Sequence, residues 1–243
     1  MPSQCFLSII IPAYNEEERL KQSLPDLKEF LKQQSFIWEL ILVDDGSSDK
    51  TKDAHTSFFT DEEDVKVIHI PANRGKGFAV RKGMLASKGE IVLISDADFS
   101  TPLTEWSKLY QTLQQGYDIA IGSRSLAESD VIIRQAWYRE GMGRIFNWMV
   151  RLLVLDGFVD TQCGFKCFRR EAVLPVFEKM VIDRFSFDVE MLFVAQKHGL
   201  AIKEVPVKWK NVLFSRVRII ADSVTMLRDL LRIRFNSMLG TYD

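Results

Sequence analysis

Two aspartates follow a short apolar run in the middle of the chain, in the sequence EIVLISDADFS at residues 90–100. Asp96 and Asp98 are separated by one residue, and two carboxylates held that close raise each other's pKa unless a cation neutralises them. Divalent ions such as Mg²⁺ and Mn²⁺ prefer one or two carboxylates together with substrate phosphate oxygens. The pair therefore suits a site for a divalent cation and a diphosphate. The alternative is that one aspartate only caps a following helix.

The loops expected after the first two apolar runs carry residues that suit recognition of a nucleoside. Tyr14, in PAYNEE, offers a flat ring for stacking, and Pro12 fixes the backbone before it. Asp44 and Asp45, in VDDGSSDKT, follow the second run and precede a segment rich in helix-capping residues. One of these two aspartates could be a helix cap, and the other could accept hydrogen bonds from a base or a ribose.

A lysine between two glycines follows the third apolar run, in the sequence NRGKG. Gly75 and Gly77 permit close approach of the backbone to a ligand, and Lys76 supplies positive charge toward a phosphate. The chain has neither the GxxxxGK(S/T) sequence of a P-loop nor a GxGxxG sequence after its first apolar run. These patterns argue against a P-loop protein and against a dehydrogenase.

Short apolar runs alternate with helix-like segments through the first half of the chain, which predicts βαβ units. Right-handed crossovers then give a mostly parallel sheet flanked by helices, an α/β fold of Rossmann-like type. The carboxyl ends of the strands meet at one edge of such a sheet, where ligands bind, so the loops described above are expected to converge there. The expected helices cover about residues 17–34, 49–59 and 77–87, and the expected strands lie within residues 6–15, 38–47, 65–71, 90–95 and 117–124.

Length and composition indicate one compact globular domain over residues 1–243, with a net charge of −1 and therefore no expected nucleic-acid partner. The three cysteines lack metal-finger spacing and favour packing roles in a reducing compartment. The first apolar run has no basic segment before it and is typical of a strand rather than a signal peptide. No stretch approaches the roughly 18 uncharged apolar residues of a membrane span, so any membrane contact is expected to be peripheral.

Positive charge is concentrated in the second half of the chain, where the helices are expected to be longer and the strands fewer. Between residues 134 and 151 four arginines stand against one acidic residue, and between residues 208 and 234 seven basic residues stand against two. We interpret these segments as amphipathic helices suited to an anionic membrane surface, and the alternative is that their apolar stripes face the core. The interleaved apolar residues include Trp137, Trp148, Leu152, Leu230 and Leu231.

The motifs IIIPAYNEE, LVDDGSSDKT, NRGKG and DAD, in this order, resemble those of the inverting family-2 glycosyltransferases of GT-A fold. The segments GSR, DTQCGFKCF, RFSFDVE and VPVKW look like the polyprenyl-phosphate branch of that family. This branch includes dolichol-phosphate mannose synthases and dolichyl-phosphate glucosyltransferases, and the chain is more similar to the latter. The resemblance covers nearly the whole chain and implies a nucleotide-sugar half at residues 1–125 and an acceptor half at residues 126–243 with a C-terminal amphipathic helix.

The resemblance assigns residues to the donor side of the site. It implies that Asp96 and Asp98 bridge the diphosphate through Mg²⁺ or Mn²⁺, which makes Asp98 a catalytic residue. Ser100 stands where the mannose synthases can have a glutamine as third metal ligand; serine is a weaker ligand, and water could complete the shell instead. The residues implied to bind the nucleotide are Pro12, Tyr14, Glu16, Asp45, Lys76 and Asp96.

The resemblance also assigns residues to the acceptor side. Those implied to bind the lipid phosphate are Arg124, Arg139, Lys210, Ser215 and Arg216. Arg124 is expected to act in catalysis as well, because a guanidinium group can hold a phosphate by two hydrogen bonds. Leu213 departs from the glycine that bacterial mannose synthases often have there. Asp188 and Glu190, in SFDVE, are expected either to contact sugar hydroxyls or act as a base, or to be acidic residues at a helix N-terminus.

The implied activity is transfer of a hexose, with inversion, from a nucleotide sugar to a polyprenyl phosphate of dolichyl type. UDP-glucose is the favoured donor and GDP-mannose the next, because both kinds of enzyme share the motifs above. The alternatives are a GT-A transferase with another acceptor and a non-catalytic, membrane-associated nucleotide-binding protein. A sugar-phosphate nucleotidyltransferase is disfavoured, because PAYNEEERL is not a glycine-rich basic loop. The expected location is the cytoplasmic face of a membrane, with peripheral attachment.

Overall fold

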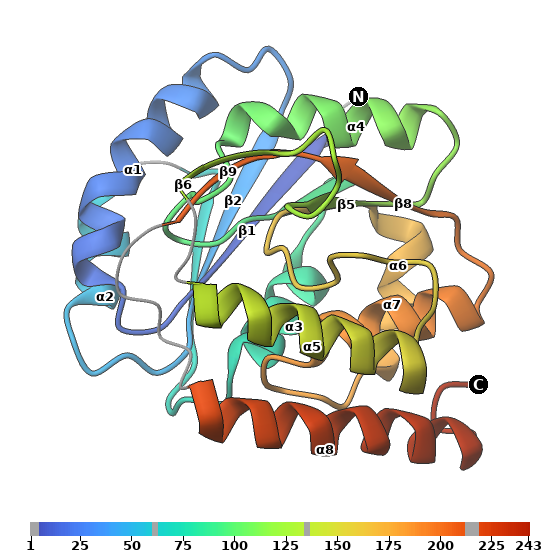
Figure 1. Ribbon diagram of the computed structural model, residues 1–243. Helices are drawn as coiled ribbons and strands as arrows, with labels where there is room; N and C mark the ends of the chain where they lie inside the picture. The colour runs from blue at the N-terminus through green and yellow to red at the C-terminus, as the bar shows by residue number, and fades with distance from the viewer. Residues whose placement is uncertain (1–4, 60–62, 134–136, 212–218) are drawn as a thin grey trace.

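The computed structural model describes residues 5–59, 63–133, 137–211 and 219–243. Within them, the main sheet has seven strands in the order β3-β2-β1-β4-β7-β5-β8 (Figure 1). β7 is antiparallel to its neighbours β4 and β5, and the other neighbouring strands are parallel. The strands of this sheet are β1 (Leu7–Ala13), β2 (Trp38–Asp44), β3 (Val65–His69), β4 (Ile91–Ile94), β5 (Ile119–Ser123), β7 (Lys166–Arg169) and β8 (Ile202–Pro206).

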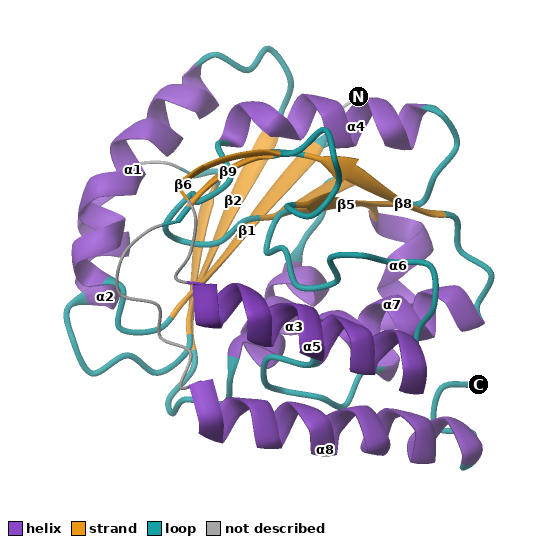
Figure 2. Ribbon diagram, in the orientation of Figure 1, coloured by secondary structure: helices purple, strands orange, loops and turns teal. Residues whose placement is uncertain are grey.

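Helices cover both faces of the main sheet (Figure 2). A second, small sheet pairs β6 (Asp130–Ile133) in parallel with β9 (Lys208–Lys210). The helices are α1 (Glu17–Lys32), α2 (Thr51–Phe58), α3 (Lys76–Ala86), the 3-10 helix η1 (Leu103–Glu105), α4 (Trp106–Gln114), α5 (Trp137–Leu153), α6 (Arg170–Lys179), α7 (Phe187–Lys197) and α8 (Ile219–Met238).

Two apolar cores lie on opposite faces of the sheet because the side chains of a strand alternate in direction. Leu7 and Ile9 of β1 pack in one core with α1 and α4, whereas Ile10 packs in the other core with α3, α6 and α7. The pair α5 and α8, which lie side by side, closes the second core through Val150 and Leu230 (Figure 1). The cysteines Cys163 and Cys167 are buried and unpaired, as the sequence predicted for packing residues.

The predicted mostly parallel α/β sheet is confirmed, and the helices and strands of the first half occur in the predicted order. The helix expected at residues 17–34 ends at Lys32, and the one expected from residue 49 begins at Thr51. Two strands of the main sheet, β7 and β8, were not predicted. β7 enters between β4 and β5 in the opposite direction. It brings the segment that precedes it, residues 159–165, toward the carboxyl end of β4.

Backbone strain is concentrated in the loops at this edge of the sheet. Among the described residues that are not glycine, Asn15 and Phe99 have positive φ angles, 53° and 43°. They follow β1 and β4 respectively. Such a conformation costs roughly 1 kcal/mol or more and persists only where the surroundings fix it. The edge predicted to bind ligands is therefore held in a defined, strained conformation.

Candidate active site

The loops after β1 and β2 are joined through Asn15. Its backbone N–H donates to Ser47 Oγ at 2.9 Å, and its side-chain Oδ1 accepts a hydrogen bond from the Ser48 N–H at 2.8 Å. The neighbouring Tyr14 ring is 38% exposed at the edge of the sheet, as stacking on a base requires. Pro12 lies inside β1 and is buried.

Glu16 is connected to the aspartate pair through Arg19. Both carboxylate oxygens of Glu16 accept hydrogen bonds from Arg19 NH1 at 3.0 Å. The same nitrogen lies 3.8 Å from Asp98 Oδ2. The structure thus places Glu16 beside the predicted metal site through an arginine that the sequence analysis did not single out.

Asp45 holds the loop that carries Lys76. Its buried carboxylate accepts hydrogen bonds from the backbone N–H groups of Gly75 and Arg74 at 2.7 and 2.9 Å, and from Asn73 Nδ2 at 2.8 Å. Burial raises the pKa of Asp45, although the two backbone donors oppose this shift. The sequence suggested a helix cap or a nucleoside ligand for these aspartates, and holding the Lys76 loop is a third role. A contact between Asp45 and the nucleoside stays a prediction.

The Lys76 loop packs directly on the backbone that precedes α7. A Cβ atom added to Gly75, where φ is 120°, would lie 2.5 Å from the carbonyl oxygen of Asp183. One added to Gly77 would lie 2.5 Å from Phe187 Cβ. Only glycine fits at either position, and the close packing fixes the point from which the Lys76 side chain extends.

Lys76 neutralises the first aspartate of the pair. Its Nζ lies 2.5 Å from Asp96 Oδ1. Burial alone would raise the pKa of Asp96, but Lys76, with smaller contributions from Lys166 and Arg124, holds it below its ordinary value. Asp98 Oδ1 instead accepts hydrogen bonds from the N–H of Ser100 at 3.0 Å and from its hydroxyl at 2.8 Å.

The donor set around Asp96 and Asp98 fits a divalent cation that shares its ligands with a substrate. Both groups are carboxylates, and the described residues contain no cluster of three or more acidic, histidine or cysteine side chains that could hold a metal alone. Gly164 leaves space for the Asp96 side chain, because a Cβ atom at residue 164 would lie 2.1 to 2.5 Å from the carboxylate atoms of Asp96. Mg²⁺ or Mn²⁺ held by two carboxylates would take further oxygen ligands from phosphate and water.

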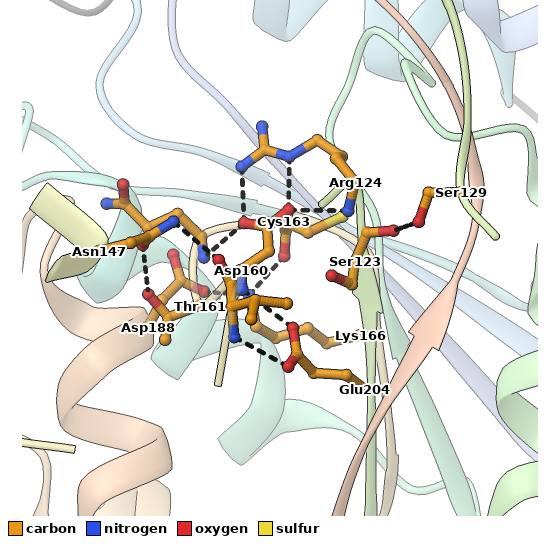
Figure 3. Close-up of polar contacts among 12 residues, drawn as sticks. Ser123, Arg124, Ser129, Asn147, Asp160, Thr161, Cys163, Lys166, Asp188 and Glu204 are labelled. Carbon is orange, nitrogen blue, oxygen red and sulfur yellow. Dashed lines mark hydrogen bonds and ion pairs between the residues drawn. The ribbon is translucent and has the colours of Figure 1, made fainter. Parts of the chain in front are cut away.

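Arg124 forms a two-pronged ion pair with Asp160 (Figure 3). Its Nε and NH2 donate to the two carboxylate oxygens at 2.7 and 2.8 Å, and its backbone N–H donates to Oδ2 at 2.9 Å. Burial alone would raise the pKa of Asp160, but Arg124 holds it below its ordinary value. The side chain of Arg124 remains 29% exposed, and its guanidinium group lies 5.6 Å from the ring of Trp209 on β9.

The segment around Asp160 is tied to β8 and α5. The carboxylate of Glu204, on β8, accepts hydrogen bonds from the N–H groups of Val159 and Asp160, each at 2.9 Å (Figure 3). Asn147, on α5, donates from Nδ2 to the carbonyl oxygen of Val159 at 3.0 Å. These bonds fix residues 159–160, which lead directly to Gly164.

Asp188 pairs with a buried lysine, Lys166 (Figure 3). Lys166 Nζ lies 2.5 Å from Asp188 Oδ1 and also donates to the carbonyl oxygen of Cys163. Asp188 lies in the first turn of α7, as one of the two predicted alternatives requires. Burial raises its pKa, with Lys166 opposing the shift. In the structure Asp188 anchors the Gly164 segment, and a catalytic role for it stays a prediction.

Glu190 has protein partners as well. Its fully buried carboxylate accepts hydrogen bonds from the N–H groups of Val181 and Ile182 at 3.0 and 2.8 Å and from the Tyr242 hydroxyl at 2.6 Å. These bonds fix the start of the segment on which the Lys76 loop rests. Glu190 is thus a structural residue here rather than a sugar ligand.

The predicted acceptor residues are placed only in part. The N–H of Lys210, at the end of β9, donates to the carbonyl oxygen of Ser100 at 2.9 Å, which joins this strand to the loop of Asp98. Arg139 belongs to the first turn of α5, where the structure describes the backbone alone. Ser215 and Arg216 lie outside the described residues.

Comparison with known proteins places this site in a family. The sequence model described as Glycosyl transferase family 2 matches residues 8–176, well over half of the chain. The chain belongs to this family. The predicted resemblance to the family-2 glycosyltransferases is therefore confirmed, and the assignment of Asp96, Asp98 and Lys76 to its active site stays a prediction.

Curated relatives resemble the chain over nearly its whole length. "Dolichyl-phosphate beta-glucosyltransferase" of Dictyostelium discoideum is 36% identical over 249 residues, which cover 98% of this chain and 76% of the relative. The proteins of the same name from Homo sapiens and Saccharomyces cerevisiae are each 34% identical and cover 97% and 98% of this chain and 77% of their own length. The similarity extends beyond residue 176 and includes the predicted acceptor half.

Solved structures confirm the GT-A fold of this family member. Glucosyl-3-phosphoglycerate synthase from Mycobacterium tuberculosis, in complex with Mn²⁺, UDP-glucose and phosphoglyceric acid, superposes with a TM-score of 0.71 at 18% identity. The alignment covers 98% of this chain and 80% of that protein. A complex of the same enzyme with Mn²⁺, UDP and glucosyl-3-phosphoglycerate gives a TM-score of 0.68 at 20% identity. At this level of identity the likeness establishes the fold alone.

Sequence reasoning missed several residues that organise the site. Gly164, Lys166 and Asp160 lie in DTQCGFKCF, a segment that was noticed only as a family signal. Gly164 carried a signal that could have been used, because a glycine beside a strand often marks a close approach of another group. Arg19 gave no such signal, since arginines on the first turns of helices usually face solvent.

We predict that Gly164→Ala displaces the Asp96 carboxylate and lowers glycosyl transfer about 100-fold, because a shift of about 1 Å at a reacting site has effects of that size. The measurement is the transfer rate of the folded variant, with folding checked by thermal unfolding. Gly143→Ala, on α5, is the matched control, since an added Cβ meets no atom within 4 Å there. Wild-type activity in Gly164→Ala would refute the close contact.

We predict that Asp160→Asn lowers the free energy of unfolding at pH 7 by about 2 to 4 kcal/mol, because Arg124 loses its charged partner while partly retaining solvent. The folded-state pKa of Asp160 lies below its unfolded value, so the pair stabilises the protein fully above about pH 4 and is lost as the pH falls through the folded value. Denaturant titrations across this range should show a steeper loss for the wild type than for the variant. Parallel curves would contradict this, and the exposed Asp26→Asn serves as control.

Proposed function

We propose that the protein transfers glucose from UDP-glucose to a polyprenyl phosphate of dolichyl type, with inversion at the anomeric carbon. The observation that carries this proposal is the Lys76–Asp96 ion pair beside Asp98, a set of one ammonium and two carboxylates suited to a diphosphate and a divalent cation. The names of relatives that are 34 to 36% identical over nearly the whole chain support glucose as the sugar and dolichyl phosphate as the acceptor.

The nature of the acceptor decides what the site must do. A phosphate monoester has a second pKa near 6, so it is largely dianionic at pH 7 and needs no general base to become a nucleophile. Orientation and charge neutralisation are then the main requirements, which suits a site rich in arginine and lysine. Burial of Asp188 and its pairing with Lys166 accord with a mechanism in which no carboxylate base is needed.

The donor side is proposed to hold the nucleotide through residues that the structure gathers at one edge. Tyr14 stacks on the base, and Lys76 neutralises the diphosphate. Asp96 and Asp98 hold Mg²⁺ or Mn²⁺, which when bound stabilises the negative charge of the departing nucleoside diphosphate. Pro12, Glu16 and Asp45 complete the proposed nucleoside site, with Asp45 also holding the Lys76 loop.

The acceptor side is proposed to lie between β9 and the loop of Asp98. The backbone N–H of Lys210 is bonded to Ser100, and the Arg124 guanidinium group lies over the ring of Trp209, the residue before Lys210. These contacts support the proposal that both basic side chains border the metal site. Arg124 is held by Asp160 in a fixed orientation, which would aim the acceptor phosphate for in-line attack on the anomeric carbon. Arg139, Ser215 and Arg216 are proposed as the remaining phosphate ligands.

With UDP-glucose and a polyprenyl phosphate, the purified protein should release UDP and form a β-linked product, measured by nucleotide release and by proton NMR of the anomeric centre. Asp98→Asn and prolonged treatment with EDTA should both abolish turnover, because each removes the proposed cation from the leaving group. The thermal midpoint of the variant should stay close to that of the wild type, and Asp26→Asn should retain activity.

Other results of these assays would change the proposed metal, donor, activity or acceptor. Activity that survives chelation would exclude the metal, and turnover of GDP-mannose in place of UDP-glucose would change the donor. Nucleotide binding without turnover would indicate a non-catalytic binder, and transfer to an acceptor other than polyprenyl phosphate would reassign the acceptor half.

We further propose that α5 and α8 rest on an anionic membrane surface that carries the lipid acceptor. None of the helices in the described residues is long and apolar enough to cross a membrane. Exposed arginines flank exposed apolar stripes on both helices, a composition that suits lipid headgroups. The exposed apolar residues are Ile145, Trp148 and Leu152 on α5, and Val224, Leu227, Leu231, Phe235 and Met238 on α8.

The buried stripes of the same helices qualify the sequence interpretation. Val150 of α5, and Met226 and Leu230 of α8, face the second core, so each helix has one apolar stripe inside and another outside. Each helix therefore combines the two predicted alternatives, because one apolar stripe faces the core and the other faces the surface. Attachment to the cytoplasmic face stays a prediction, because the structure does not distinguish the sides of a membrane.

Replacing Arg228 and Arg234 together by alanine should weaken binding to vesicles that contain phosphatidylserine by roughly 2 kcal/mol, or about 30-fold, because each basic residue at such a surface contributes roughly 1 kcal/mol. Co-sedimentation at low ionic strength measures this, and high salt should release the wild type. Lys32→Ala with Lys66→Ala removes the same charge elsewhere and should have little effect. Binding that ignores lipid charge and salt would contradict an electrostatic anchor.

A further inference from the structure

Lys76 occupies the place in the site where positive charge is most needed. Its Nζ lies 2.5 Å from Asp96 Oδ1, and both side chains retain solvent access, with 23% and 38% of their surface exposed. Burial alone would lower the pKa of Lys76, but the carboxylates of Asp96, Asp188 and Asp98 together raise it. The ammonium group therefore serves as the counter-ion of Asp96.

Each carboxylate around Lys76 has a charged neighbour of its own. Asp96 pairs with Lys76, and Asp188 pairs with Lys166. Asp98 Oδ2 lies 3.8 Å from Arg19 NH1, which also binds Glu16. Removal of Lys76 would therefore leave Asp96 without its paired cation, a position that a divalent cation could take.

Lys76 and Lys166 differ in how their ammonium groups are held. Lys166 is buried and held by both Asp188 and the carbonyl oxygen of Cys163. The backbone of Lys76 is fixed by the contacts of Gly75 and Gly77, and by a 3.0 Å hydrogen bond from the Phe78 N–H to Asp183. The side chain of Lys76 has a flexible four-carbon stem, so its ammonium can move while the loop stays in place.

We propose that Lys76 and the divalent cation compete for Asp96, so that the free protein holds the metal weakly until a nucleoside diphosphate draws the ammonium onto its phosphates. This inference rests on the proposed function, because it takes the diphosphate as the ligand. The departure of Lys76 exposes Asp96 to the metal, and the metal in turn strengthens diphosphate binding. Metal and nucleotide therefore bind interdependently, with Lys76 as the group that couples them.

The test measures Mn²⁺ affinity without nucleotide, from the electron paramagnetic resonance signal of the free ion. Lys76→Met should tighten Mn²⁺ binding by about tenfold or more, because the positive charge paired with Asp96 is removed. The same variant should weaken UDP binding at saturating Mn²⁺, measured by calorimetry, because the diphosphate loses its lysine. A lysine that only stabilises the loop would instead weaken both affinities when replaced.

Three further variants test whether the change in Mn²⁺ affinity depends on the charge of Lys76 and on Asp96. Lys76→Arg keeps the charge and should retain weak Mn²⁺ binding without nucleotide. Adding Asp96→Asn to Lys76→Met should remove the gain in Mn²⁺ affinity. Lys21→Met, on the exposed surface of α1, is the matched control and should change neither affinity. If Lys76→Met fails to fold, Lys76→Gln carries the same test with a polar side chain.

Unchanged or weaker Mn²⁺ binding by folded Lys76→Met or Lys76→Gln would overturn the competition, even if the wild type binds UDP and Mn²⁺ together. A gain in Mn²⁺ affinity that persists after Asp96→Asn is added would also overturn it. Failure of the proposed function looks different: the wild type would then bind no UDP in the presence of Mn²⁺, or would bind UDP and transfer no glucose. The two failures are thus separated by the wild-type measurements alone.

Discussion

The ion pair between Lys76 and Asp96 is the interaction on which the rest of the site depends. Asp96 and Asp98 follow a buried strand, where like charges repel and burial disfavours ionisation. A cation must be supplied there, and the protein supplies one from a neighbouring loop at 2.5 Å. That loop reaches Asp96 because Asp45 binds its backbone and because glycines let it lie against the segment before α7. The arrangement of four loops thus follows from one electrostatic requirement.

Residues in the second half of the chain hold Asp96 in position. β7 enters the sheet between β4 and β5, and the segment before it brings Gly164 against Asp96. Lys166, Asp160 and Glu204 fix that segment through charged hydrogen bonds, of which the one from Lys166 is buried and the others are partly buried. Buried ion pairs add little to stability compared with apolar packing, but the loss of one partner is costly, so they are better suited to fixing geometry than to increasing stability. These contacts link β7, β8 and α7 to the carboxylate of Asp96 through Gly164.

The sequence predicted the sheet, the order of its first elements and the convergence of the loops, because strand periodicity and right-handed crossovers determine which ends meet. It also selected Asp96, Asp98 and Lys76, which the structure brings together. It did not predict the role of Asp45, since the partners of that carboxylate come from a loop about 30 residues away. β7 was missed because its sequence, KCFR, has a charged residue at each end and lacks the apolar run that marks β4, a strand of the same length. Lys166 was missed because lysine is rarely buried, and nothing local reveals its partner on α7.

The most direct test of this account is a crystal structure of the protein with UDP and Mn²⁺, in which anomalous scattering locates the metal. We expect Mn²⁺ between the carboxylates of Asp96 and Asp98 and the diphosphate, with Lys76 Nζ on a phosphate oxygen and no longer on Asp96. The Asp45 and Gly164 contacts should remain as they are, because the account assigns them to positioning rather than to movement. Mn²⁺ at another site, or Lys76 still paired with Asp96 while UDP and Mn²⁺ are bound, would contradict it.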